Sequence, residues 1–169
     1  MRMTEAETNA ACRALAEAAG RILIKKQARA AVAESLTGGM LASKIVDVPG
    51  ASNWFIEGCV TYTDEAKTRR LGVPEGVLAA HTAVSRETAR AMAEGELRLS
   101  GGDIAVSTTG LAGPGPDGYG RPAGLVFIGG ASEKGSVTKE LSLTGTRAEI
   151  RAQTVFEALK LLYKLAELI

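Results

Sequence analysis

Apolar and polar residues alternate along this chain with two periods, one typical of helices and one typical of strands. Two long stretches have helical spacing, one ending at about residue 26 and one starting near residue 147, and each begins at a capping box, Thr4–Glu7 and Thr146–Glu149. Shorter helical patterns predict helices at about 40–47, 64–71, 74–81 and 86–99. Short runs of apolar and β-branched residues predict strands at 30–33, 53–62, 103–109, 125–131 and 136–143.

The predicted elements follow the order α-β-α-β-α-α-α-β-β-β-α. Strands that alternate with helices pair in parallel through crossovers, whereas the two strands of a hairpin are antiparallel. We therefore expect an α/β fold, a three-layer α/β/α sandwich with a mixed sheet of about five strands. The first three strands are largely parallel, and the final hairpin is antiparallel. A chain of 169 residues suffices for one such domain over 1–169.

Hydroxyl and glycine residues follow three of the predicted strands, at the point where each strand ends. They are Ser35 and Thr37, then Tyr62 and Thr63, and finally 107–110. The carboxyl ends of parallel strands share one edge of a sheet, where open α/β sheets bind ligands. The simpler interpretation is that each Ser or Thr is only a helix N-cap. Three such strand ends together favour a binding site.

Glycines near these strand ends add to the expectation of a ligand. Gly38 and Gly39 are poor helix formers, so we expect them to allow a ligand close to the backbone. The free amides of the following helix would then face an anion. Segment 110–124 is rich in glycine and proline and is predicted to be a long irregular loop, which in a compact domain is usually functional or disordered.

Composition and charge exclude several classes of protein. With 20 basic and 19 acidic residues and a net charge of +1, the chain lacks the basic face of a nucleic-acid-binding domain. No apolar run approaches the length of about 20 residues that spans a bilayer, and the polar, acidic start at 1–9 does not resemble a signal peptide. Cys12 and Cys59 form no CxxC pair, so we expect buried free thiols in a reducing cytoplasm.

The candidate chemistry is that of a serine with a lysine. The single histidine, His81, has no catalytic setting and is interpreted as a surface or helix-capping residue. Clustered metal ligands and a P-loop motif are missing from the sequence. A serine nucleophile then needs another base, usually a desolvated lysine. Lys67, at the start of a helix just after Tyr62, is a better candidate than Lys44, although it could equally be a solvated helix lysine.

The C-terminal helix contributes a candidate anion ligand. Arg147 lies in its first turn, where the helix dipole disfavours a cation, and this misfit hints at a partner such as phosphate. Arg151, one turn later, could assist or simply be solvated. The residues alone therefore predict a small-molecule site for an anionic, phosphorylated ligand with a Ser/Lys/Tyr hydrolytic centre. They do not specify the reaction.

Three segments at these strand ends resemble motifs of the CinA C-terminal domain family: AESLTGG at 33–39, GCVTYTDEAK at 58–67 and STTGLAGP at 107–114. The motifs GLV at 124–126 and TGTR at 144–147 follow in the same order, and the resemblance covers about 7–165. It implies an α/β/α sandwich. For active members it also implies a metal-independent amidohydrolase without cofactors that converts nicotinamide mononucleotide to nicotinate mononucleotide and ammonia.

The resemblance also implies roles for residues at matching positions. Ser35 would be the nucleophile or the key polar group at the carboxamide, and Tyr62 and Lys67 would activate it or shuttle the proton. Arg147 would hold the phosphate. The remaining substrate contacts would come from Thr109 and Gly110, with an oxyanion hole at Thr37, Gly38 and Gly39 or in the glycine-rich loop.

The sequence departs from the family pattern at Leu36, where cysteine is common, and at Arg121, where lysine is common. Neither residue carries the implied chemistry, although Arg121 could alter the contacts with the phosphate. Full-length relatives have a further N-terminal domain resembling molybdopterin-binding proteins, which has no counterpart here, so nothing predicts its pyrophosphatase activity. The resemblance allows for a homodimer. The competing hypothesis is a non-catalytic nucleotide-binding accessory protein linked to competence or DNA damage. Direct partners among nucleic acids or membranes are not expected.

Overall fold

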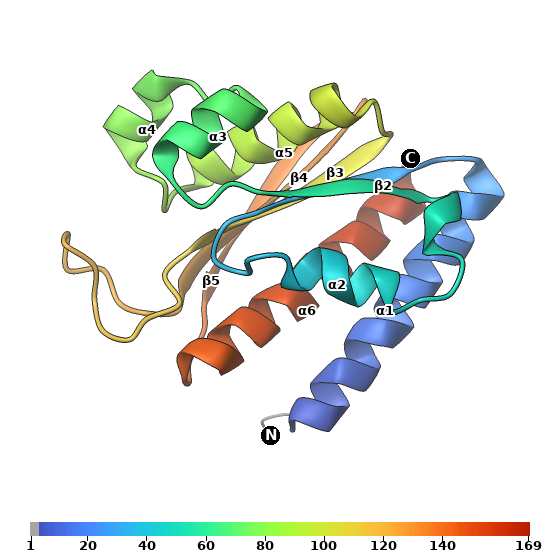
Figure 1. Cartoon of the computed structure of the whole chain (residues 1–169), viewed down its shortest axis with the longest axis horizontal. Helices are drawn as coiled ribbons and strands as arrows, with labels where there is room; N and C mark the ends of the chain where they lie inside the picture. The colour runs from blue at the N-terminus through green and yellow to red at the C-terminus, as the bar shows by residue number, and fades with distance from the viewer. Residues whose placement is uncertain (1–3) are drawn as a thin grey trace.

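A five-stranded sheet crosses the middle of the molecule, and helices cover both of its faces (Figure 1). The computed structural model describes residues 4–169, so Met1–Met3, the start of the polar N-terminal stretch, lie outside the described residues. The strands are β1 (Ala30–Glu34), β2 (Phe55–Val60), β3 (Ile104–Gly110), β4 (Leu125–Ser132) and β5 (Gly135–Ser142). The predicted α/β/α sandwich is confirmed.

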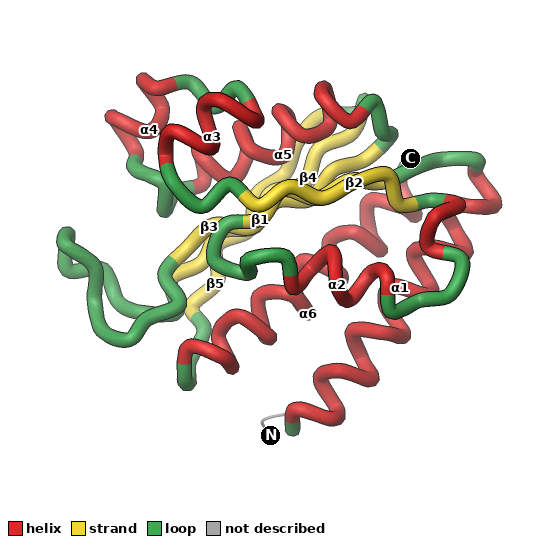
Figure 2. Tube along the Cα trace, in the orientation of Figure 1, coloured by secondary structure: helices red, strands yellow, loops and turns green. Residues whose placement is uncertain are grey.

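Three helices lie on each side of the sheet (Figure 2). One layer contains α1 (Glu5–Lys26), α2 (Met40–Val46) and α6 (Arg147–Leu168), and the other contains α3 (Asp64–Leu71), α4 (Glu75–His81) and α5 (Arg86–Ser100). The predicted capping boxes at Thr4 and Thr146 are present, and Thr63 and Ser85 cap α3 and α5. None of the described helices has a stretch long and apolar enough to cross a membrane.

The strand order β2-β1-β3-β4-β5 puts β1 at the centre of the parallel part of the sheet. β1 pairs in parallel with both β2 and β3, and Ala33 lies opposite Cys59 on one side and Ser107 on the other. β4 and β5 complete the sheet in antiparallel orientation. The carboxyl ends of β1, β2 and β3 therefore meet at one edge, as the sequence predicts.

β1 is buried along its whole length because helices cover both of its faces. Its side chains alternate between two cores, since successive strand residues point to opposite faces. Val32 packs into the larger core with α1, α2 and α6, while Ala33 packs with Leu71 of α3 and Met92 of α5. The turn that follows β1 thus starts from a rigid strand.

β2 begins at Phe55 rather than at the predicted Asn53, because Trp54 ends a short 3-10 helix, η1 (Ala51–Asn53). Trp54 is buried against α1 instead of lying in the strand. A Cβ on Gly20 would lie 2.5 Å from Trp54 Nε1, so α1 needs a glycine at this contact. Packing of one large side chain therefore decides where β2 starts.

A buried carboxyl group lies between α5 and β2. Glu96 is 2% exposed, its Oε2 accepts a hydrogen bond of 3.2 Å from the Cys59 thiol, and its Oε1 has no partner within the described chain. Burial raises the pKa of Glu96 to about 7 and that of Cys59 to about 12. Both cysteines are free thiols, Cys12 buried and Cys59 half-buried.

Glu96 makes the stability of the protein depend on pH. Its pKa is raised in the folded state, so folding stabilises the protonated form, and this contribution is lost as pH rises from about 4.5 through about 7. In the wild type, Glu96 should make the unfolding free energy fall by up to about 3 kcal/mol over this range. We expect this fall to be absent in Glu96→Gln. Urea unfolding at several pH values measures it, with the exposed Glu133→Gln as control. Parallel pH profiles for wild type and Glu96→Gln would contradict this assignment.

Candidate active site

A cavity of about 320 Å³ lies at the carboxyl edge of the parallel strands. Its walls come from the turn after β1, the start of α3, the connector between α4 and α5, the end of β3, the glycine-rich loop and the first turn of α6. The lining residues that the argument uses are Ser35, Leu36, Tyr62, Lys67, Thr109, Gly110, Asp117 and Arg147. The structure therefore brings together segments that are far apart in the sequence.

Ser35 and Lys67 form a hydrogen-bonded pair at the cavity. Lys67 Nζ lies 3.1 Å from Ser35 Oγ and donates a second hydrogen bond of 2.8 Å to the Thr61 carbonyl. Lys67 is 1% exposed and Ser35 is 8% exposed. Burial lowers the pKa of Lys67, and the charge of Asp64 opposes this shift only in part. A lysine with a lowered pKa beside a serine hydroxyl can act as its general base.

The start of α3 places Lys67. Thr63 lies three residues after the end of β2 and caps the helix by accepting the Ala66 N–H, so α3 begins at Asp64. Lys67 then lies one turn into the helix and points back toward the strand end, where the Thr61 carbonyl accepts a hydrogen bond from its Nζ. The sequence alone rates Lys67 as a candidate base or a solvated lysine; the structure shows it buried at the cavity.

The turn that carries Ser35 is held from one side by a buried carboxylate. Glu34, 1% exposed, accepts hydrogen bonds from the backbone N–H groups of Gly39, Leu41 and Ala42 at 2.9–3.0 Å. Gly39, the N-cap of α2, has no side chain to do this. The carboxylate of the last β1 residue therefore replaces the missing cap.

Arg151 holds the same turn from the other side. Its Nε donates to the Leu36 carbonyl and its Nη2 to the Thr37 carbonyl, both at 2.9 Å. Within the turn, the hydroxyls of Thr37 and Thr108 share a buried hydrogen bond of 2.8 Å. Arg151 is thus a structural clamp on the Ser35 turn, not a solvated residue and not part of the cavity lining.

Thr37, Gly38 and Gly39 do not line the cavity. The Gly38 N–H donates to the Ser35 carbonyl, and the Gly39 N–H donates to Glu34, so neither amide is free for a ligand. The two glycines are needed for their backbone angles, with φ of +58° and +96°, values that favour residues without a Cβ. The expected anion at the start of α2 is therefore not supported, because Glu34 already takes these amides.

Tyr62 and Arg147 lie at the rim of the cavity rather than beside the Ser35–Lys67 pair. Arg147 donates to the Tyr62 hydroxyl at 3.0 Å and to the Gly113 carbonyl at 2.6 Å. Tyr62 is 57% exposed, and in residues 4–169 it makes no hydrogen bond with Ser35 or Lys67. This position suits contact with a substrate better than proton transfer to Ser35.

Thr109 and Gly110 line the cavity at the end of β3, the strand that neighbours β1. The Thr109 hydroxyl donates to the Ala83 carbonyl at 2.6 Å, which ties β3 to the connector before α5. A Cβ on Gly110 would lie 2.7 Å from the Leu125 carbonyl oxygen and from Val126 Cα. Packing against β4, rather than a ligand, therefore explains the glycine.

The other candidate residues lie away from the cavity lining. His81 is exposed at the end of α4, 3.8 Å from the Glu87 carboxylate, and Lys44 pairs with Asp47 at 3.2 Å. Among the described residues, no group of three or more His, Cys, Asp or Glu side chains could hold a metal ion.

Sequence reasoning did not predict the roles of three residues that position the Ser35–Lys67 pair: Glu34, Thr61 and Arg151. One signal for Glu34 is present in the sequence, because a helix preceded by Gly38–Gly39 has no side-chain N-cap and needs another acceptor. The role of the Thr61 carbonyl cannot be recognised from the sequence, because every residue has a backbone carbonyl. For Arg151, helical spacing puts it near Arg147, but only the tertiary fold shows that it reaches the Ser35 turn.

Comparison with known proteins identifies the family. The sequence profile of the CinA C-terminal domain matches residues 12–166. This chain belongs to the CinA C-terminal domain family. A competence-damage inducible protein of Clostridium botulinum strain Langeland is 47% identical over 148 residues, which cover 88% of this chain and 36% of that protein. A CinA-like protein of Endomicrobium trichonymphae is 46% identical over 148 residues, covering 88% of this chain and 35% of that protein.

Solved structures of the CinA superfamily share the fold. A superfamily protein from Klebsiella pneumoniae 700603 superposes with a TM-score of 0.89 at 34% identity, covering 94% of this chain and 99% of that one. The competence/damage inducible protein CihA from Agrobacterium tumefaciens gives a TM-score of 0.88 at 36% identity, covering 92% and 95%. The chain spans about a third of the length of the curated relatives it matches.

The Glu34 carboxylate can be tested as the element that fixes the Ser35 turn. We expect Glu34→Gln to leave at least one α2 amide without an acceptor, since an amide side chain presents a donor there, and to lower the unfolding free energy by about 1–3 kcal/mol. Chemical denaturation measures the change, with the exposed Glu133→Gln as matched control. Equal stability of the two variants would mean that the turn does not depend on Glu34.

Proposed function

We propose that this protein hydrolyses the carboxamide of nicotinamide mononucleotide to give nicotinate mononucleotide and ammonia. The observation that carries the proposal is the buried Lys67 amine 3.1 Å from Ser35 Oγ at the floor of the cavity. Membership of the CinA C-terminal domain family, which includes amidohydrolases of this type, supports the choice of substrate.

In the first step, neutral Lys67 accepts the Ser35 hydroxyl proton while Oγ attacks the carboxamide carbon. The C–O bond forms, the carbonyl π electrons move to oxygen, and a tetrahedral oxyanion results. Its collapse breaks the C–N bond, and the Lys67 ammonium returns its proton to the leaving nitrogen, which departs as ammonia. The acyl group remains as an ester on Ser35.

In the second step, Lys67 accepts a proton from water, whose oxygen attacks the ester carbon. Collapse of this second tetrahedral species breaks the bond to Ser35 Oγ, which regains a proton from Lys67. The product is the nicotinate carboxylate with release of one proton. The same amine thus serves as base and acid in both halves of the reaction, so its lowered pKa is suited to the task.

Backbone N–H groups at the cavity support binding of the oxyanion. The Leu36 N–H directly follows the proposed nucleophile, Leu36 lines the cavity, and no acceptor within residues 4–169 takes this N–H. Ala112, Gly113 and Gly115 of the glycine-rich loop also line the cavity, and their N–H groups likewise have no acceptor in residues 4–169. Backbone donors at this position would stabilise charge that develops in the transition state.

Arg147 supports recognition of the phosphate. Its guanidinium lies at the rim, where the hydrogen bonds to Tyr62 and Gly113 hold it over the mouth of the cavity. A phosphate bound there would form charge-assisted hydrogen bonds with the fork of the guanidinium. Thr109 and Gly110 would contact the part of the substrate that lies between the phosphate and the carboxamide.

Removal of either member of the reactive pair should abolish turnover. We expect Ser35→Ala and Lys67→Met each to lower kcat for ammonia release by at least about 100-fold, because each removes a group that takes part in bond changes. The matched control is Lys44→Met, which should retain activity. Lys44 lies on α2 and pairs with Asp47, away from the cavity lining. Turnover should also persist with a chelator. Full activity of Ser35→Ala would rule out the serine mechanism, and nucleotide binding by wild type without turnover would favour the accessory-protein hypothesis.

The charge state of Lys67 should control the pH dependence of kcat/KM. The neutral amine is the base, so activity rises with pH as Lys67 loses its proton, and burial places this rise below the ordinary lysine pKa of 10.5. Asp64 raises the pKa of Lys67, so Asp64→Asn should move the rise to lower pH. Glu65→Gln, the neighbouring acidic residue on α3, is the control. An unshifted profile in Asp64→Asn would argue against Lys67 as the base.

A further inference from the structure

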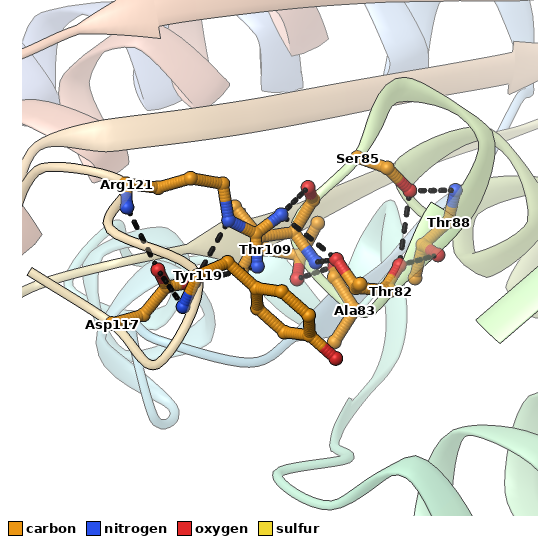
Figure 3. A network of polar contacts seen from close by, with 9 residues as sticks. Thr82, Ala83, Ser85, Thr88, Thr109, Asp117, Tyr119 and Arg121 are labelled. Atoms are coloured by element: carbon orange, nitrogen blue, oxygen red, sulfur yellow. Dashed lines mark hydrogen bonds and ion pairs between the residues drawn. The ribbon is translucent and has the colours of Figure 1, made fainter. Parts of the chain in front are cut away.

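The glycine-rich loop, residues 111–124, is fastened at a second point that the proposed chemistry does not use. Arg121 lies near the end of this loop and reaches the connector between α4 and α5 (Figure 3). Its Nη1 donates to Thr82 Oγ1 at 2.8 Å and to the Val84 carbonyl at 2.9 Å. Its Nε and Nη2 bind Asp117 Oδ2 at 2.8 and 2.6 Å. One side chain thus joins two walls of the cavity.

Both carboxylate oxygens of Asp117 accept hydrogen bonds from residues of the loop itself. Its Oδ1 accepts the N–H groups of Tyr119 and Arg121 at 3.0 and 2.9 Å, and its Oδ2 accepts the guanidinium of Arg121. The hydrogen bonds and the charge of Arg121 hold the pKa of Asp117 below its usual value. Although Asp117 lines the cavity, its oxygens are occupied, so it acts as part of the wall rather than as a ligand for the substrate.

The other end of the Arg121 contact is rigid. The Thr82 carbonyl accepts the hydroxyls of Ser85 and Thr88 at 3.1 and 2.7 Å, and the Ala83 carbonyl accepts the hydroxyl of Thr109 in β3. Figure 3 shows these contacts as one network that continues from β3 through the connector to Arg121. The guanidinium of Arg121 therefore fixes the loop to the connector, which is itself bound to β3.

We propose that Arg121 is a positioning residue that holds the glycine-rich loop as a preformed wall of the cavity and thereby sets the affinity for the substrate. A loop rich in glycine loses much conformational entropy when it becomes ordered, and a wall that is already ordered spares the substrate this cost. Arg121 lies outside the cavity lining and touches none of the reacting groups. This inference rests on the proposed nicotinamide mononucleotide hydrolysis.

Steady-state kinetics with nicotinamide mononucleotide tests the inference. We expect Arg121→Ala to raise KM about tenfold or more while kcat stays within about twofold of wild type. Arg121→Lys should give a smaller increase, since lysine keeps the charge but not the fork that reaches three partners. Arg90→Ala, an exposed arginine on α5, is the matched control for loss of one positive charge. A fall in kcat with unchanged KM would overturn the inference.

A double variant separates positioning from electrostatics. In Arg121→Ala the Asp117 carboxylate loses its cation and could repel an anionic substrate. If repulsion were the cause, Arg121→Ala/Asp117→Asn would recover the KM of wild type, which would overturn the positioning role. We expect KM to stay raised in the double variant, because the loop remains detached from Thr82 and Val84.

Hydrogen exchange gives a result that does not depend on activity. The amides of Asp117, Tyr119, Gly120 and Arg121 are all hydrogen-bonded within the loop. We expect them to exchange slowly in wild type and in Arg90→Ala and much faster in Arg121→Ala. Unchanged exchange in Arg121→Ala overturns the inference even if the protein is active. If wild type shows no turnover, the proposed function fails, while the exchange rates still decide whether Arg121 orders the loop.

Discussion

The buried amine of Lys67 is the constraint on which the cavity depends. A lysine with almost no exposed surface is costly to keep charged, and in residues 4–169 no carboxylate forms an ion pair with it. Its two polar contacts are the Ser35 hydroxyl and the Thr61 carbonyl, and burial lowers its pKa, an effect that the charge of Asp64 offsets only in part. The fold keeps those two partners in place through the parallel pairing of β1 with β2, because Ser35 follows one strand and Thr61 follows the other. Loss of this pairing would remove both partners at once.

The turn between β1 and α2 is rigid because one side chain binds its backbone N–H groups and another binds its backbone carbonyls. Glu34 takes the N–H groups at the start of α2, and Arg151 takes the carbonyls of Leu36 and Thr37. A buried helix start needs such acceptors, since its first amides have no partner within the helix. In residues 4–169 the Leu36 and Thr37 N–H groups of this turn have no acceptor, and of these two residues only Leu36 lines the cavity. The partners of the other groups therefore leave two donors unpaired, one of them at a residue that lines the cavity.

Local signals in the sequence were enough to predict the order of the elements and the sheet type. The capping boxes at Thr4 and Thr146 are present as the sequence predicts, and the strand ends at Ser35, Thr61 and Gly110 meet at one edge because parallel strands share their direction. The predicted start of β2, Asn53, was wrong by two residues. Local signals could not show this, because the packing of Trp54 against Gly20 involves residues far apart in the sequence.

The roles of polar residues could be predicted only where a single partner is available. Gly38 and Gly39 before a helix are compatible with a bound anion or with an internal carboxylate, and the sequence does not show that Glu34 folds back onto the amides. Arg147 and Arg151 lie one helical turn apart, yet one reaches the rim and the other reaches the Ser35 turn. Which carbonyls a guanidinium meets depends on segments more than 100 residues away for Arg151.

The cavity walls differ in how they are held, and this bears on how such a site can change. The floor, with Ser35 and Lys67, is held by the turn after β1 and by the first turn of α3, and both side chains are buried. The opposite wall is a loop that Arg147 and Arg121 hold through carbonyl and carboxylate contacts. The ends of the loop pack against the core at Ala112 and Gly124, whereas its middle, 114–120, is mostly exposed, so we expect substitutions in this middle part to leave the sheet intact. The Ser35–Lys67 pair and the loop that forms the opposite wall therefore belong to different structural elements, so changes in the middle of the loop can alter the shape of the cavity while Ser35 and Lys67 stay in place.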